Sequence, residues 1–202
     1  RSGYLAAPGT YRARMEVWQS ETRSVLGEQV FTVKPLDISD ETAIDGVRIE
    51  LAEFQAKTAE LVRSVSGTVR NVEEIRGRIA SLEKALFNTS KAMPDHHKEL
   101  RQLSDSLYTI EVKLTGDETI SSRFELTPWS INERVNSIVF GHWASLSPVT
   151  ETHKQAYEIA KAEFDLLRRD FLRLKEQLQA FEVSVDGIGA PWTPGRLPEM
   201  QQ

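Results

Sequence analysis

The sequence predicts a mainly α-helical protein, an antiparallel bundle of long, heptad-patterned helices preceded by a β-hairpin. Two observations predict this class. After residue 44, apolar residues recur at alternating spacings of three and four, which places them on one face of a helix. Before residue 36, apolar and polar residues alternate one by one, as they do in a strand with one covered face. The pattern therefore changes from strand to helix once along the chain.

The β-hairpin is expected within residues 1–36. Ala7-Pro8-Gly9-Thr10 has the composition of a type II turn, in which Gly supplies a positive φ. A first strand over 10–18 and a second over 28–34 flank a polar turn over 19–27. The two faces of the first strand hold Tyr11, Ala13, Met15 and Val17 on one side and Arg12, Arg14, Glu16 and Trp18 on the other.

Two strands cannot cover their own apolar face. Tyr11, Met15, Val17 and Phe31 carry large side chains, and burying each one stabilises a protein by about 1.5–3 kcal/mol. A hairpin alone is marginally stable in water. We expect this face to be covered by strands from a separate polypeptide or from before Arg1, by the bundle, or by a second copy of the chain.

The longest helix is expected to begin at Ser39, a favourable N-cap residue, and to continue to about residue 86. Its apolar stripe, which we call the seam, spans about 64 Å at a rise of 1.5 Å per residue. Other helices must therefore lie beside it. The seam is apolar except for two threonines: Ile44, Val47, Leu51, Phe54, Thr58, Leu61, Val65, Thr68, Val72, Ile75, Ile79, Leu82 and Leu86.

Three shorter helices are expected to follow. The second helix of the chain begins at Pro94. An irregular segment over 115–127 follows it, and the third helix begins at Thr127-Pro128. The last helix begins with a capping box from Thr152 to Gln155 and ends at Asp186-Gly187. Their apolar positions are Leu100, Leu103, Leu107, Ile110 and Leu114; Ile131, Val135, Ile138, Val139 and Trp143; and Tyr157, Ala160, Phe164, Leu167, Phe171, Leu174, Leu178, Phe181 and Val185. The tail is rich in Pro and Gly and is expected to be loose, with Trp192 as a candidate to dock on the bundle.

The helix lengths allow two arrangements. The two middle helices, about 30 Å and 27 Å long, together match one long helix, which gives three columns. The other arrangement is an up-down-up-down four-helix bundle in which the short helices cover only part of the long ones. The narrow seams favour three columns.

Composition argues against some classes of partner. Of the 202 residues, 40% are hydrophobic and 27% are charged, with a net charge of −5 and no block of Lys and Arg. Nucleic acids and anionic membranes are bound mainly through clustered positive charge, so neither is an expected partner. No apolar run approaches the roughly 18 residues of a membrane span. Without cysteine, disulfides and thiolate metal sites are excluded.

No catalytic, cofactor-binding or metal-ligating residue is predicted. Bundles that bind two metal ions use inward Glu-x-x-His pairs, and no histidine here has Glu three residues before it. His96, His97, His142 and His153 are therefore expected at the surface or at helix caps. The sequence has no phosphate-binding loop, Gly-x-Ser-x-Gly or His-Glu-x-x-His motif. A carboxylate pair without a sequence signature is the distant alternative for catalysis.

Three segments carry a family resemblance: Ala7-Pro8-Gly9-Thr10-Tyr11-Arg12-Ala13-Arg14-Met15-Glu16-Val17, then Phe31-Thr32-Val33-Lys34-Pro35, and Trp129-Ser130-Ile131-Asn132-Glu133-Arg134-Val135. In this order they resemble the C-terminal region of bacterial BNR-repeat, sortilin-like β-propeller proteins, often described as glycosyl hydrolases. The resemblance covers about residues 7–185. The chain begins Arg1-Ser2-Gly3 without an initiator Met, and we expect it to be a fragment.

The resemblance implies a division of the chain. In that family an Ig-like β domain follows the propeller and ends in such a hairpin, and a long helical bundle completes the protein. Residues 1–36 would be the end of the Ig-like domain, 37–187 the bundle and 188–202 the tail. The resemblance also implies an extracytoplasmic protein, periplasmic, cell-surface or secreted. Its presumed active region would lie on the propeller, so no catalytic residue is carried over.

The expected function is a non-catalytic accessory module, a spacer or docking bundle that binds protein. Its partner would be the propeller and β domain of the same protein, or a separate chain that completes the hairpin. The alternative is a self-associating coiled-coil scaffold, in which the outer face or seam of the long helix pairs between chains. An enzyme is the third possibility.

Overall fold

The computed structural model describes residues 3–19, 21–34, 41–123, 125–145 and 147–196, with the backbone alone for 41–47. Helices make up 65% of the chain, which confirms the predicted mainly helical class, and a two-stranded antiparallel hairpin precedes them. In chain order the elements are β1 (Gly9–Gln19), β2 (Thr22–Val33), α1 (Glu41–Phe87), α2 (Pro94–Thr115), α3 (Glu118–Ser121), α4 (Ile131–His142) and α5 (Glu151–Gly187).

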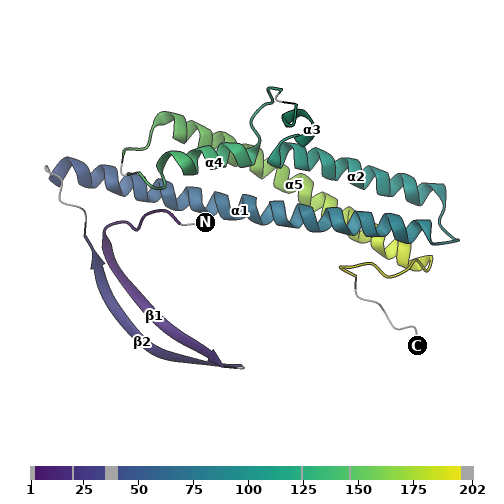
Figure 1. Cartoon of the computed structure of the whole chain (residues 1–202), viewed down its shortest axis with the longest axis horizontal. Helices are drawn as coiled ribbons and strands as arrows, with labels where there is room; N and C mark the ends of the chain where they lie inside the picture. The colour runs from purple at the N-terminus through teal and green to yellow at the C-terminus, as the bar shows by residue number, and fades with distance from the viewer. Residues whose placement is uncertain (1–2, 20, 35–40, 124, 146, 197–202) are drawn as a thin grey trace.

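The long helices form three columns (Figure 1). α1 and α5 are two of the columns and run in the same direction, while α2 and α4 lie end to end in the third and run back. Ion pairs join the third column to its neighbours: Arg76 of α1 lies 2.8 Å from Glu111 of α2, and Arg134 of α4 lies 3.7 Å from Glu163 of α5. This is the three-column arrangement that the narrow seams favour.

The core follows the predicted apolar positions. All those of α2 and α5 are buried. In α1 the positions from Leu51 to Leu86 are buried except Thr68, which is half-buried, and Ile44 and Val47 lie outside the described side chains. Each helix therefore places its stripe against the other columns of the same chain, and this burial is the main favourable contribution to folding.

Helix starts differ from the predicted positions because side-chain caps decide them. α4 begins at Ile131 rather than at Thr127-Pro128, since the Ser130 side chain accepts a hydrogen bond from the backbone N–H of Glu133. α5 begins after Thr150 rather than Thr152. The segment predicted to be irregular contains the one-turn helix α3, and α2 begins at Pro94 as predicted. The expected N-cap Ser39 lies outside the described residues.

The second strand is longer than predicted. β2 begins at Thr22 rather than at residue 28, so the segment expected to be a polar turn is mostly strand. The reason is pairing: the residues opposite it in β1 continue the ladder to Gln19, which pairs with Thr22.

The tail is packed, not loose, as far as Arg196. Gly189, rather than Gly187, has the positive φ, at 78°, that turns the chain after α5. Thr193 and Arg196 are buried, while Trp192 is mostly exposed and donates its indole N–H to the Arg196 carbonyl. The tail therefore docks through Arg196, while the indole of Trp192 bonds within the tail itself.

Arg196 docks because it meets the polar end of α5. Its guanidinium donates to the side chain of Asp186 and to the carbonyl of Pro191, at 2.7 Å in the second case. The buried carboxylate of Glu182 receives two hydrogen bonds from Arg78 of α1, at 3.0 and 2.6 Å. This buried network ties the tail to α5 and α5 to α1.

Candidate functional site

The β-hairpin is the part of the molecule that the bundle does not use. β1 and β2 pair over the whole length of β1, but Met15 lies opposite Gly27 while Glu16 lies opposite Val25. Leu26 is thus an extra residue, a β-bulge that bends the ribbon. Figure 1 shows the curved hairpin projecting away from the three columns.

One face of the hairpin is mainly apolar and carries no charge. Because side chains alternate along a strand, the observed register places Tyr11, Ala13, Met15, Val17, Phe31 and Val33 on this face, which we call the apolar hairpin face, together with the uncharged Gln29 and Ser24. The Tyr11 and Phe31 rings stack with centroids 5.9 Å apart. Met15 is nevertheless 65% exposed and Phe31 48% exposed. The expectation of a half-buried strand therefore holds for Tyr11 and Val17, which are half-buried, and is wrong for Ala13 and Met15, which are exposed.

The other face carries the charges, and they pair with one another. Arg12 lies 3.3 Å from Glu28, and Glu16 is shared by Arg14 at 2.8 Å and Arg23 at 2.5 Å. Exposed pairs of this kind contribute little to stability, typically well under about 1 kcal/mol each. Their main effect here is to leave the charged face close to neutral and the apolar hairpin face free of charge.

Both outer edges of the hairpin are open. The sheet has two strands, so along the described residues the outward N–H and C=O groups of β1 and β2 have no strand beside them. Open edges bind further strands readily, and native proteins usually shorten or cover them. An edge of this length next to an exposed apolar face has the two features needed for strand addition by another polypeptide.

An N-terminal arm, residues 3–8, joins the hairpin to the bundle. The Tyr4 ring packs edge-on against Trp143 just after α4, with centroids 6.1 Å apart. A hollow of about 210 Å³ lies between the arm and α1 and is lined from the two sides by residues including Leu5, Pro8, Leu51 and Gln55. The hairpin is therefore anchored at its base and free along its length.

The four predicted surface or capping histidines do not all lie where expected. His96 caps α2, because its Nδ1 accepts from the N–H of Met93, and His97 is exposed. His142 is only 2% exposed, so the expectation is wrong for this residue. The spacing could have indicated its burial, since His142 continues the 131–135–138 series of α4 by four residues.

His142 and His153 lie together at the junction of α4 and α5. Their ring centroids are 5.2 Å apart, and the Phe54 ring of α1 lies 4.9 Å from His142. Burial, and then the neighbouring His153, lower the pKa of His142 from 6.5 to about 4. Among the described residues, no group of three or more His, Asp or Glu side chains is placed to share a metal ion.

A second hollow, of about 440 Å³, lies where the third column passes from α2 to α4. Its walls are mainly apolar and include Trp129, Ile120 and Leu166, with Lys113 and Glu163 also lining it. Sequence reasoning did not find it, because it forms only where α2 ends, α4 begins and α5 passes behind both.

The described helices include none with the length and hydrophobicity needed to cross a bilayer. Comparisons of the chain with protein-family models, with curated proteins and with solved structures found no match.

Proposed function

We propose that this chain is a non-catalytic protein-interaction module, in which the three-column bundle supports the hairpin and the hairpin adds to the β-structure of another polypeptide. The observation that carries the proposal is the exposure of the apolar hairpin face beside two open strand edges. In the bundle, in contrast, the apolar stripes of the helices are buried against one another within the chain.

Physical chemistry supports strand addition over other modes of binding. Main-chain hydrogen bonds along an open edge supply affinity, and the alternate side chains select the partner. The apolar hairpin face contains no charge, so covering it requires no charged group to be desolvated. A partner that contributes one or more strands with a similar apolar face would bury both faces and close one edge.

We extend the proposal to the family that the sequence resembles. The module would be the C-terminal accessory region of a secreted, extracytoplasmic BNR-repeat, sortilin-like β-propeller protein of glycosyl hydrolase type. The hairpin would be the end of its Ig-like domain, and the helices would pack by heptads. The order of elements supports this extension, since a hairpin with a Pro-Gly-Thr-Tyr start is followed directly by long helices.

The self-associating scaffold has less support. It needs the seam or outer face of α1 to pair between chains, but the described seam is covered by α2, α4 and α5 of the same chain. Gly67 and Gly77 face open space, so α1 does offer an outer surface, yet no apolar stripe follows them. The hairpin is the better candidate for contact with another molecule.

Site-specific photocrosslinking in the source organism tests the proposal. A benzophenone amino acid replaces Met15 on the apolar hairpin face or, as a matched control, Trp18 on the opposite face of the same strand. We expect crosslinks from position 15 into β-strands of a β domain, on the same or another polypeptide, and few from position 18. Equal crosslinking from both positions, or crosslinks from position 15 only into the helices of this chain, would contradict it.

A further inference from the structure

His142 occupies an unusual position for a titratable side chain. It is the last residue of α4, it is 2% exposed, and neither ring nitrogen has a hydrogen-bond partner among the described residues. An unpartnered imidazole nitrogen in such a place is costly, and a charged imidazole is far more so. The ring is held between Phe54 of α1 and His153 of α5.

His153 closes the pocket from the side of α5. A side-chain carbon at Gly141 would lie 2.4 Å from its Nε2, so the imidazole rests directly on the α4 backbone. Its Nδ1 is buried, and no described residue forms a hydrogen bond with it. The two rings therefore pack against each other across the junction of α4 and α5, and a proton on His142 would place a charge in a buried pocket.

The surrounding charges do not compensate a proton. From α1, Lys57 lies 4.9 Å from the Phe54 ring centroid and 4.5 Å from that of Tyr157 of α5, whose ring lies 5.7 Å from Phe54. Glu50 of α1 and Glu151 of α5 are both paired with Lys154, at 2.6 and 3.2 Å. Among the described residues, no carboxylate forms an ion pair with either imidazole.

The same turn of α4 holds the N-terminal arm. The carbonyl of His142 accepts a hydrogen bond of 2.8 Å from the side-chain amide of Gln55, which also lines the hollow beneath the arm. Trp143, the next residue, packs against Tyr4 of the arm. The arm continues into β1, where the Tyr11 hydroxyl donates to the Ala7 carbonyl at 2.7 Å. Figure 1 shows the arm beside α1 before the strand turns away.

We propose that His142, packed against His153, forms a proton-sensitive latch: while His142 is neutral, the end of α4 stays docked and holds the arm and hairpin in one orientation, and protonation of His142 releases them. The latch would regulate how the hairpin is presented, and in that respect it rests on the proposed function. Its chemistry depends on this chain alone.

The size of the effect follows from linkage. The docked state holds the pKa of His142 near 4, against 6.5 for a free imidazole. The ratio of docked to undocked molecules then falls about tenfold for each pH unit between 6.5 and 4, which gives about 30-fold between pH 7.5 and pH 5. Above pH 6.5 the ratio is constant.

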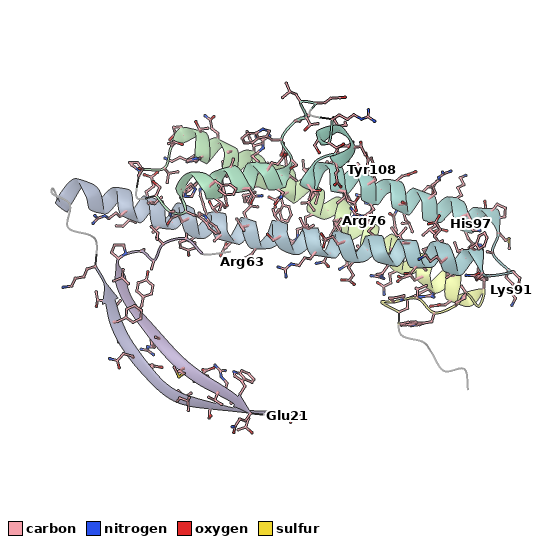
Figure 2. The ribbon with its side chains drawn as sticks, in the orientation of Figure 1. Glu21, Arg63, Arg76, Lys91, His97 and Tyr108 are labelled. Atoms are coloured by element: carbon pink, nitrogen blue, oxygen red, sulfur yellow. The ribbon has the colours of Figure 1, made fainter. Side chains whose placement is uncertain are left out.

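Hydrogen exchange on the full chain measures this ratio directly. The amide of Trp143 donates to the Val139 carbonyl and is protected only while the end of α4 is formed. We expect its protection factor, corrected for the intrinsic pH dependence of exchange, to fall about 30-fold from pH 7.5 to pH 5. His142→Phe should abolish that fall, and His97→Gln, which changes an exposed histidine at the far end of α2 (Figure 2), should leave it unchanged. A protection factor that does not change with pH, or an equal fall in His142→Phe, would overturn the latch.

A distance measurement tests the connection to the hairpin. The chain has no cysteine, so Glu21→Cys at the tip of the hairpin and Arg63→Cys on α1 can carry a pair of spin labels (Figure 2). With His142→Arg as a permanent charge, we expect a broad distribution of distances at pH 7.5, and with His142→Phe a narrow one. A narrow distribution in His142→Arg together with lost Trp143 protection would show that α4 releases without the hairpin.

If His142→Arg does not fold, the exchange comparison between the unaltered chain and His142→Phe still decides the latch. Neither measurement contains a partner strand. A failure of the photocrosslinking test would therefore leave these results unchanged, and the two proposals can fail separately.

Discussion

The bundle and the hairpin treat the same kinds of side chain in opposite ways. Phe181 in α5 is 1% exposed, whereas Phe31 in β2 is 48% exposed; Val185 is fully buried, whereas Val30 is 54% exposed. The difference lies in whether other elements of the chain pack against the apolar side chains. A helical stripe finds two other columns within this chain, but each face of a two-stranded ribbon needs another layer, and the described residues do not supply one.

This contrast shows where stability and where recognition lie. Burial of apolar surface concentrates in the three columns, so unfolding of the chain is governed by them. The hairpin keeps its shape through its ladder and its exposed ion pairs, which stabilise weakly. A surface that contributes little to folding is free to bind another molecule.

The largest expected effect separates two phenylalanines. Phe181→Ala leaves a cavity in the core and should lower the free energy of unfolding by about 3–5 kcal/mol. Phe31→Ala removes an exposed ring and should change it by less than about 0.5 kcal/mol. Urea unfolding followed by circular dichroism at 222 nm measures both. Similar losses for the two variants would show that the hairpin packs as a second core, and the contrast would fail.

Acid should weaken the bundle through His142. Its pKa is lowered in the folded state, so the unfolded chain binds the proton first, and stability is full above pH 6.5 and is lost as the pH falls towards 4. The loss amounts to about 3 kcal/mol at pH 4 relative to pH 7. Unfolding at a series of pH values should show this loss as the difference between the unaltered chain and His142→Phe. A constant difference across that range would refute the prediction.

The buried ionic network at the end of α5 should show a smaller effect. Glu182→Ala leaves the Arg78 guanidinium, 18% exposed, without its carboxylate, and should cost about 2 kcal/mol. Glu176→Ala on the exposed side of the same helix is the control and should be close to neutral. Equal effects of the two substitutions in chemical denaturation would mean that the network contributes nothing beyond surface charge.

The smallest effect concerns the start of α4, where the third column resumes. Ser130 accepts from the Glu133 N–H, and its own N–H donates to the Glu133 carboxylate at 2.8 Å. Ser130→Ala should cost about 1 kcal/mol. Ser104→Ala, at an exposed position within α2, should cost nothing because Ala favours helix. Thermal unfolding that ranks Ser104→Ala as the more damaging would place the cap elsewhere.

The fold was largely readable from periodicity, and the site was readable in part. The apolar positions of α2 and α5 were predicted residue by residue, and so were the two faces of β1. Helix starts were missed because Ser130 and Thr150 compete with other possible caps nearby, and only the path of the chain selects among them. The burial of His142 was not predicted, because a polar residue was not counted as a continuation of the apolar positions 131, 135 and 138 of α4.

By itself, the sequence determined what each segment is: spacings of three and four set the buried stripe of every long helix, and alternation separated a charged face from an uncharged one in the hairpin. These are local properties of the backbone. Only the tertiary structure decided which surfaces are covered, because cover depends on the distance between segments far apart in the chain. It joined α2 and α4 into one column, buried His142 against His153, docked Arg196 on α5, and left the apolar hairpin face open.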